Sequence, residues 1–285
     1  MTTLDLKKIS SNINLSKLPD DLTISTMTLT CNLDTLFNLP NIGKYMDLKF
    51  GGIVYIKYGG VNNIKSLIKL KKKNKTKKKK QNFYNQATVM ADSQNKSKIN
   101  TKLFKNGSIQ MTGCKSIENC ISSIKILCEE LKKIKAVYNK KEKKIIRKPF
   151  VSNPEKVSFD EIKNFKINMI NSNFDIGFLI DRQNLYEILN KKNIICTYEP
   201  CIHACVNIKY NYKNKDTISI FVFESGSIII TGAKNEDHIT EGYKFIINIL
   251  FENYDNIVKI DIDEFLKRID IVKFLEENNN EEICC

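Results

Sequence analysis

A nine-residue pattern that occurs twice constrains the fold of this chain more than any other feature of the sequence. The pattern Gly-Ser-Ile-x-x-Thr-Gly-x-Lys begins at Gly107 and again, 119 residues later, at Gly226. Each copy begins three residues after a phenylalanine, Phe104 or Phe223. A repeated segment with matching surroundings is typical of a duplicated structural unit. We therefore predict two related halves, and 285 residues are enough to give each half a core.

The residues around the second copy predict a short helix and a long helix with antiparallel strands between them. The strand-like segments are 165–176, 203–210, 217–223 and 227–231, and the expected short helix is 182–192. A long amphipathic helix follows at 235–254, where Asn235 suits the N-cap position.

The first copy repeats this order, so the predicted fold class is α+β with two equivalent repeats. Its expected strands are 22–31, 83–91, 99–104 and 108–112, and its expected short helix is 32–39. Asn106-Gly107 between two alternating runs is a strong hairpin signal, and a long helix is expected from Ser116. Residues 47–81 have no evident counterpart and are interpreted as an insertion that ends in the run KKKNKTKKKK.

Alternation along the hairpin strands predicts which side chains face away from the long helix, because successive side chains point to opposite faces. In the second copy the outward set includes Phe221, Phe223 and Ile229. An apolar face of this kind usually marks a binding surface, although a second layer could also cover it. The outward set of the first copy is more polar and consists of Asn100, Lys102, Phe104, Ser108, Gln110 and Thr112.

The motif Phe-x-x-Gly-x-[Ile/Met/Val]-x-x-Thr-Gly-[Ala/Cys]-Lys, present twice and opening a long helix each time, resembles the TATA-box-binding protein family. The segments YEP (198–200) and IFVFESGSIIITGAK (220–234) are similar to that family's second repeat. The resemblance covers roughly 20–138 and 160–255. It implies a pseudo-symmetric saddle, a curved antiparallel sheet with helices on its convex face and the minor groove of DNA against its concave face.

The resemblance also implies a domain organisation. We expect a first saddle repeat at 20–138, which contains the Lys-rich insertion at about 47–81, and a second repeat at 160–256. A linker is expected at 139–159, and a C-terminal helix with an acidic tail at 257–285.

Carried over from the family, the expected DNA contacts fall on residues of both repeats. Wedges of this family are flat apolar side chains that enter a base step. The wedge phenylalanines are Phe104 and Phe223, with Phe221 and Ile229 lining the groove. Threonines can donate to the N3 and O2 acceptors of A·T pairs, and lysines can lie near phosphate. The remaining expected contacts are Thr112, Thr231, Lys115, Lys234, Ile24, Lys102, Gln110 and His203.

Several positions depart from the family pattern. The second wedge of each pair falls on His203 and on Gln86, unless the segment FGGIVYIKY supplies the missing strand and Phe50 the wedge. We favour the segment 83–91, because the alternative leaves an unusually long segment inside a hairpin.

The central asparagine of each repeat also departs from the family pattern. The simplest alignment replaces it by Leu22 in the first repeat and Met169 in the second. Asn168 and Asn171 lie close enough in sequence for a slipped register to restore the second one.

Composition favours an acidic partner. The net charge of +14 suits nucleic acid or another anionic surface. The lysine run at 71–80 could contact phosphates, act as a nuclear-localisation signal or be a solvated loop. The chain shows no signal peptide and no apolar run long enough for a membrane, so we expect no membrane association and no secretion. Nine irregularly spaced cysteines are then expected to be free thiols.

We expect neither a cofactor nor an enzyme. Cys201, His203 and Cys205 would share one strand face, but they span about 13 Å, too far for one zinc ion. No catalytic set or glycine-rich phosphate loop is recognisable in the sequence.

Two functional hypotheses follow. The first is a TATA-box-binding-protein-like initiation factor that binds A·T-rich promoter DNA in the minor groove, with altered bending or specificity. The second is a saddle-fold scaffold that binds transcription proteins and has little specific DNA recognition. Either would work with general initiation factors and RNA polymerase, in the nucleus or at another site of transcription. For a protein encoded by a large DNA virus, that site would be the cytoplasmic replication site.

Overall fold

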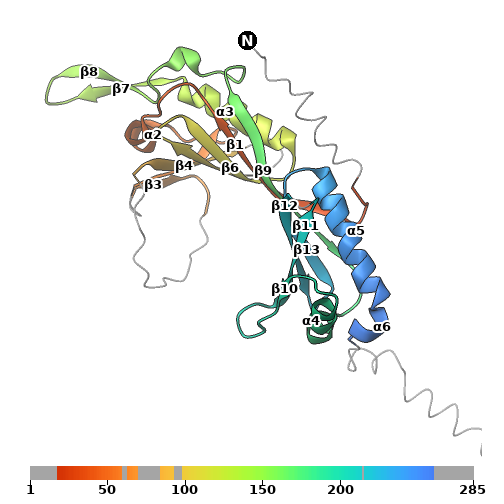
Figure 1. Ribbon diagram of the computed structural model, residues 1–285. Coiled ribbons are helices and arrows are strands. Elements are labelled where there is room, and N and C mark those ends of the chain that lie inside the picture. The colour runs from red at the N-terminus through yellow and green to blue at the C-terminus, as the bar shows by residue number, and fades with distance from the viewer. Residues whose placement is uncertain (1–17, 60–62, 70–83, 93–97, 214, 260–285) are drawn as a thin grey trace, which may run out of the picture. The chain divides into compact units, whose positions relative to one another are not determined.

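The chain folds into antiparallel sheets with helices, as the computed structural model in Figure 1 shows. The described residues are 18–59, 63–69, 84–92, 98–213 and 215–259. The first half contains β1 (Thr23–Asn32), α2 (Leu39–Tyr45), β2 (Ile53–Tyr58), β3 (Ile64–Ser66), β4 (Gln86–Asp92), β5 (Lys98–Phe104), β6 (Ser108–Cys114) and α3 (Ile117–Leu131). A hairpin follows, β7 (Ile134–Asn139) and β8 (Lys144–Pro149), and then a 3-10 turn, η2 (Pro154–Lys156). The second half contains β9 (Lys163–Asp175), α4 (Arg182–Lys191), β10 (Cys196–Thr197), β11 (Cys205–Tyr212), β12 (Asp216–Phe223), β13 (Ser227–Ala233), α5 (Glu236–Glu252) and α6 (Tyr254–Ile257).

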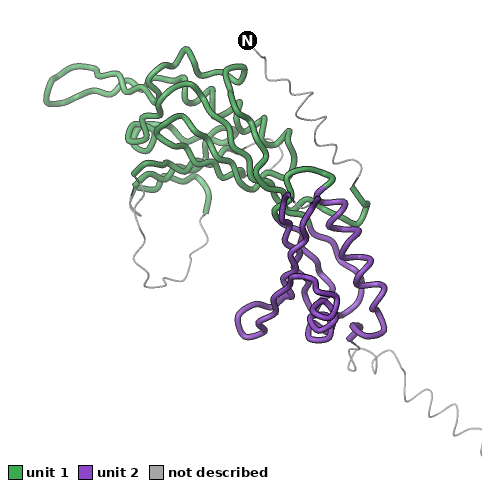
Figure 2. Tube along the Cα trace, viewed as in Figure 1, with its two compact units in different colours: residues 1–172, 232–237 green, residues 173–231, 238–285 purple. Residues whose placement is uncertain are grey.

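Two compact units make up the fold (Figure 2). Unit 1 comprises residues 1–172 and 232–237, and unit 2 comprises residues 173–231 and 238–285. The strand order in unit 1 is β9-β1-β6-β5-β4-β2-β3, and in unit 2 it is β10-β11-β12-β13 followed by the end of β9. The hairpin β7–β8 forms a separate two-stranded sheet.

In unit 1 the long helix α3 covers one face of the sheet. The Ser116 side chain caps the start of the helix by accepting a hydrogen bond from the backbone N–H of Asn119. The helix packs against β2, β4, β5 and β6. The strand side chains beneath it are fully buried and include Ile99, Leu103, Ile109 and Met111.

In unit 2 the helix α5 takes the same place. A Cβ added at Gly242 would lie 3.7 Å from the Ile230 side chain and 4.0 Å from that of Ile218, so the helix packs directly on the inward side chains. Ile220, Val222 and Ile228 are also fully buried. The predicted α+β fold class with two equivalent repeats is confirmed.

The short helix of the first repeat begins later than predicted. The sequence prediction is 32–39, whereas α2 is Leu39–Tyr45. The Asn38 side chain caps it by accepting from the backbone N–H of Asn41, and Pro40 lies in the first turn, where its missing N–H needs no partner. The preceding residues stay extended because the N–H groups of Leu33 and Phe37 donate to the hairpin turn.

The insertion in the first repeat is shorter than predicted. β2 pairs with β4 just as β10 pairs with β11, since Ile56 lies opposite Val89 and Cys196 lies opposite Ile208. The segment FGGIVYIKY, which contains β2, therefore corresponds to β10. It does not correspond to β11, as it would have to for Phe50 to be a wedge. The favoured segment 83–91 provides β4, which pairs with β5. The lysine run lies outside the described residues.

The segment between the repeats is not a simple linker. The sequence prediction is a linker at 139–159, but this region contains all of β8 and the turn η2. Nearly all of the predicted C-terminal helix and tail lies outside the described residues. Among the residues that the structure describes, no helix has the length and hydropathy needed to cross a membrane.

Candidate nucleic-acid interface

The repeated pattern forms the same hairpin turn in both units. Gly107 and Gly226 have φ angles of +88° and +86°, in the left-handed region that favours glycine. A Cβ added at Gly107 would lie 2.3 Å from the Leu33 carbonyl oxygen, and one added at Gly226 would lie 2.4 Å from that of Phe178. Each turn therefore packs against backbone so closely that only glycine fits.

Matching hydrogen bonds put the two repeats in register. Leu33 donates to the carbonyl of Gly107 at 3.0 Å, and Ile176 donates to that of Gly226 at 3.1 Å. Similarly, the backbone N–H of Phe37 donates to the carbonyl of Lys105, and that of Ile180 donates to the carbonyl of Glu224. The first strands therefore correspond at a spacing of 143 residues, and the hairpins correspond at a spacing of 119.

The outward face of the unit 2 hairpin carries a contiguous apolar group. Phe221 lies directly across from Ile229 on β13 and from Asn207 on β11. Phe223 follows two residues later on the same face, opposite Cys205. All five side chains are half-buried, in contrast to the fully buried side chains beneath α5. The alternation predicted from the sequence is thus present in the structure.

Hydrogen-bonding groups accompany this apolar group. Thr231 lies opposite Ser219, whose hydroxyl accepts a 2.7 Å hydrogen bond from the Lys209 ammonium. Asn207, next to Phe221, has a buried Oδ1 without a hydrogen-bond partner among the described residues. The sequence prediction missed Asn207, because its position beside Phe221 depends on the β11–β12 register.

The outward face of unit 1 has the same geometry with more polar side chains. Lys102 lies opposite Gln110, and Asn100 lies opposite Thr112. Phe104 is half-buried at the end of β5. The Oδ1 atom of Asn100 is buried without a hydrogen-bond partner in the described part of the chain. Unit 1 therefore offers hydrogen-bonding groups where unit 2 offers rings and branched side chains.

The register corrects the predicted second wedge position of the first repeat. Gln86 lies opposite Phe104, whereas Cys205 lies opposite Phe223, so Gln86 corresponds to Cys205 and not to His203. The residue that corresponds to exposed His203 is Tyr84, two positions before Gln86.

Tyr84 presents an aromatic ring at this corrected position. Its side chain is 65% exposed, and its ring meets Tyr58 edge to face at 6.4 Å. Phe50, the other candidate, is 71% exposed in the turn before β2, a strand that does not touch β5.

The register also corrects the predicted central position of the first repeat. A spacing of 143 residues pairs Met169 with Thr26, whereas Leu22 is buried just before β1. Ile24 and Thr26 are half-buried on the same side of β1 as Thr30. The Asn168 amide donates to the Thr30 hydroxyl at 3.0 Å, so Asn168 contributes an outward polar group beside β1.

Lysines stand at matching positions beyond each hairpin. Lys115 and Lys234 are both exposed, one residue after β6 and β13 respectively. Two glycines precede them by two residues, Gly113 and Gly232, with φ of +88° and +87°. In unit 1 this glycine forms a bulge, because the β1–β6 register skips it between Thr112 and Cys114.

In the second repeat an ionic cluster of Arg182, Glu224 and Lys259 holds the loops around the outward face. The Arg182 guanidinium donates to the Ala204 carbonyl at 2.7 Å and to the Glu224 carboxylate, and it lies 5.6 Å from the Tyr198 ring centroid. Lys259 also donates to Glu224. The pKa of Glu224 is lowered, mainly by the Lys259 hydrogen bond and further by Arg182. The cluster joins the hairpin turn to the residue after His203.

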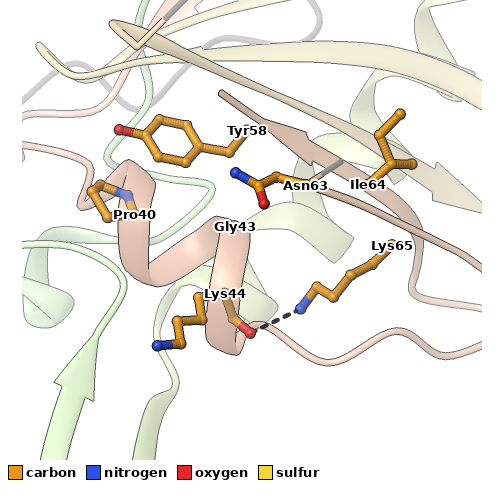
Figure 3. A pocket seen from close by; sticks show the side chains of 7 residues that line it. All are labelled: Pro40, Gly43, Lys44, Tyr58, Asn63, Ile64 and Lys65. Carbon is orange, nitrogen blue, oxygen red and sulfur yellow. Dashed lines mark hydrogen bonds between the residues drawn. The ribbon is translucent and has the colours of Figure 1, made fainter. Parts of the chain in front are cut away.

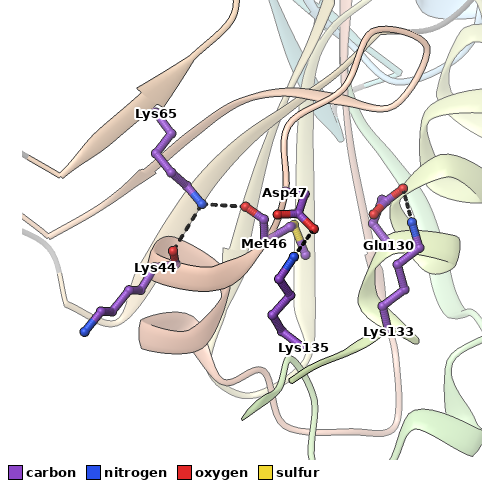
Figure 4. A network of polar contacts seen from close by, with 7 residues as sticks. All are labelled: Lys44, Met46, Asp47, Lys65, Glu130, Lys133 and Lys135. Atoms are coloured by element: carbon purple, nitrogen blue, oxygen red, sulfur yellow. Dashed lines mark hydrogen bonds and ion pairs between the residues drawn. The ribbon is translucent and has the colours of Figure 1, made fainter. Parts of the chain in front are cut away.

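A pocket beside α2 is separate from the outward face. It has a volume of about 570 Å³ and is lined by Pro40, Gly43, Lys44, Tyr58, Asn63, Ile64 and Lys65 (Figure 3). Tyr58 pairs with buried Ala87, and a Cβ added at Gly43 would lie 2.7 Å from the Tyr58 Cβ, so the pocket lies on the helix-bearing side. The Lys65 ammonium donates to the carbonyls of Lys44 and Met46 at the end of α2 (Figure 4).

The described residues contain no group of three or more His, Cys, Asp or Glu side chains that could hold a metal ion. Cys196, Cys201 and Cys205 are free thiols. Burial raises the pKa of the Cys196 and Cys205 thiols, which disfavours the thiolate. The outward faces present apolar side chains, hydrogen-bonding groups and positive charge.

Comparison with known proteins gives the family. The family model of transcription factor TFIID, or TATA-binding protein, matches residues 164–253. A TATA-box-binding protein-like protein of Acanthamoeba polyphaga mimivirus is 39% identical over 276 residues, which cover 90% of this chain and 72% of that protein. The chain belongs to the TATA-box-binding protein family. This family consists of DNA-binding transcription factors that are not enzymes.

Two further relatives are more distant. The TATA-box-binding protein 2 of Entamoeba histolytica is 27% identical over 155 residues, 54% of this chain and 68% of that protein. Among solved structures, the Methanococcus jannaschii TBP is 17% identical with a TM-score of 0.49, and the match covers 81% of this chain and 99% of that one. The resemblance read from the repeated motif is confirmed by family membership.

Proposed function

We propose that this protein is a transcription initiation factor that binds A·T-rich duplex DNA in the minor groove through the outward faces of its two hairpins. The observation that carries the proposal is the cross-strand group Phe221, Phe223 and Ile229 on the face of unit 2 opposite α5. Apolar side chains suit the minor groove of A·T pairs, which lacks the guanine amino group.

The ends of the hairpins supply the wedges. Phe223 and Phe104 stand at equivalent strand ends, and a flat apolar ring there can enter a base step and kink the duplex. Tyr84 is the second ring of the first repeat, and His203 takes the corresponding place in the second. A pair made of one phenylalanine and one polar ring predicts weaker bending than two phenylalanines would give.

Polar outward side chains read and position the duplex. The hydroxyls of Thr112 and Thr231 donate to the N3 and O2 acceptors of A·T pairs, and Lys115 and Lys234 contact phosphates. The amides of Gln110 and Asn207 add donors to base edges. Ile24 and Lys102 complete the contact set on the outward face of unit 1.

In this function the protein works with general transcription initiation factors and the RNA polymerase machinery. It acts in the nucleus or, if a large DNA virus encodes it, at the cytoplasmic replication site. Exposed helix surfaces such as that of α5, which carries Phe251 at 56% exposure, offer contacts to those proteins.

The deciding experiment compares Phe223→Ala with Phe251→Ala. Both remove a phenylalanine ring, but Phe251 lies on α5, away from the outward face. Binding and bending are measured on an A·T-rich duplex and on a G·C-rich duplex of equal length. Loss of a stacked ring is expected to weaken A·T-rich binding by about 10- to 100-fold for Phe223→Ala only.

Phe104→Ala and Tyr84→Ala, which remove the two rings of the first repeat, are also expected to reduce bending of the duplex. If Phe223→Ala and Phe104→Ala leave affinity and bending as in the wild type, the wedge assignment is wrong. A wild type that binds both duplexes equally and only at low salt would favour the alternative, a scaffold for transcription proteins.

A further inference from the structure

The hairpin β7–β8 stands apart from the sheets that carry the outward faces. Its strands pair with each other from Ile134 opposite Pro149 to Asn139 opposite Lys144, and among the described strands they pair with none of the 11-stranded sheet. A two-stranded hairpin is marginal on its own in water, so its persistence depends on what its faces contact.

One face of the hairpin is anchored on the end of α2. The Lys135 ammonium forms a 2.6 Å ion pair with Asp47, seen in Figure 4. The Lys148 ammonium lies 6.0 Å from the Tyr45 ring centroid. At the base of the hairpin the Asn41 amide donates to the Pro149 carbonyl at 2.7 Å. These contacts fix the base and leave the turn projecting.

The opposite face is exposed and combines apolar side chains with one arginine. Tyr138 and Ile145 form a cross-strand pair near the turn and are 59% and 69% exposed. Ala136 and Arg147 form the next pair on the same face and are also exposed. An exposed tyrosine, isoleucine and arginine on one short ribbon are better suited to contact than to solvation.

Positive charge is concentrated in the same hairpin. Residues 134–149 contain six lysines and one arginine against a single glutamate. Lys140, Lys141 and Lys143 lie exposed in the turn, and Lys144 pairs with Glu142 at 2.6 Å. The left-handed φ of +47° at Lys143 closes this turn. The exposed end of the hairpin therefore has a strong positive field that suits a polyanion.

We propose that the β7–β8 hairpin is a second DNA-binding arm, separate from the outward faces of the hairpins that follow β4 and β11. The turn lysines contact phosphates, and the Tyr138–Ile145 pair lies against the groove wall. A two-stranded ribbon has the width that the major groove admits, and β-ribbons read the grooves of duplex DNA in other folds. The arm rests on the proposed function only in taking duplex DNA as its ligand.

The test measures how salt affects the binding of a triple variant, Lys140→Gln/Lys141→Gln/Lys143→Gln, to a duplex with an A·T-rich centre and long flanks. The slope of log K against log salt is negative, and each phosphate that the variant no longer neutralises makes it less steep by about 0.9, so its magnitude should fall by up to about 3. Affinity near 0.15 M salt should fall by about 10- to 100-fold. The matched control is Lys125→Gln/Lys132→Gln/Lys133→Gln, which removes the same charge from α3 and the residues just after it.

The arm and the minor-groove proposal give separable results. The arm is supported when the turn variant shows a weaker salt dependence and a lower affinity, to the same extent on duplexes with A·T-rich and G·C-rich centres, while the control variant shows neither change. A turn variant that matches the control overturns the arm, and this is the result expected if the ribbon serves an acidic protein surface. If the wild type binds both duplexes equally and Phe223→Ala leaves its affinity unchanged, but the turn variant loses affinity, the minor-groove proposal fails and the arm stands.

Discussion

The two units share a scaffold but not a contact surface. At the 119-residue spacing, Phe221 corresponds to Lys102 and Ile229 to Gln110, although the register around each pair is the same. The buried side chains of the hairpin strands beneath the long helices are apolar in both units, apart from Thr101 on β5. The repeats therefore agree where side chains pack and differ where they face outward, which separates the requirements of folding from those of recognition.

The loops around the outward faces differ in the same way. Arg182 of the second repeat corresponds to Leu39 of the first, and Glu224 corresponds to Lys105. The first repeat therefore lacks the ionic cluster and instead holds its hairpin turn with a 3.3 Å backbone bond from Lys105 to Asn85. The second repeat combines the more apolar face with the loops held by the ionic cluster, so under the proposed function it should make the tighter DNA contacts.

The largest effect should appear in the shared scaffold. Gly226→Ala and Gly107→Ala each place a Cβ against a backbone carbonyl at a positive φ, where neither side can give. We expect each to lower the free energy of unfolding by about 2–3 kcal/mol, measured by urea denaturation.

The control for the glycine variants is Gly51→Ala. Gly51 also has a positive φ, +72°, but a Cβ there would meet nothing within 4 Å. This variant should lose only about 1 kcal/mol through backbone strain. If Gly226→Ala and Gly107→Ala differ widely from each other, the two turns are not equivalent and the shared scaffold is in doubt.

An intermediate effect should come from exchanging outward side chains between the units. Ile229→Gln gives unit 2 the residue that unit 1 has, and Gln110→Ile does the reverse. We expect Ile229→Gln to weaken binding to A·T-rich DNA by about 10-fold, because a polar amide replaces an apolar side chain that packs in the groove. Gln110→Ile should strengthen binding a few-fold, because it makes the opposite replacement.

Fluorescence titrations with an A·T-rich and a G·C-rich duplex would measure both exchanges. The unfolding free energies should stay near the wild-type value, since neither side chain belongs to the buried set. If each exchange changes the affinity for the A·T-rich duplex and for the G·C-rich duplex by the same factor, the outward face does not contribute to base preference.

Patterns local in sequence predicted most of the fold. Alternation gave the inward and outward sets of β5, β6, β12 and β13, and a serine before a periodic apolar run gave the start of α3. The position of α2 was predicted too early, because the extended residues before it are held by Gly107 and Lys105. Those partners are distant in sequence, so no local pattern reveals them.

The candidate site was less predictable, because strand register decides it. The sequence alignment placed the second wedge position of the first repeat on Gln86, two residues from Tyr84, the residue that the strand register gives. Asn207 likewise gains its place beside Phe221 only through the pairing of β11 with β12. The β7–β8 hairpin contains a lysine-rich turn without glycine, proline or an Asn-Gly pair, which hides it from turn signals.

The smallest effect should come from the ionic cluster that only the second repeat has. Glu224→Gln removes the carboxylate that accepts from Lys259 and Arg182. Because the folded-state pKa of Glu224 lies below its ordinary value of 4.5, its charge stabilises the fold above about pH 4.5, and this contribution is lost as pH falls through the folded-state pKa. Glu224→Gln should therefore lower the free energy of unfolding at pH 7 by about 0.5–1 kcal/mol. Urea denaturation from pH 7 to pH 3 should show the difference from wild type shrinking below pH 4.5. A difference that stays constant with pH would assign the loss to altered packing instead of the ionic cluster.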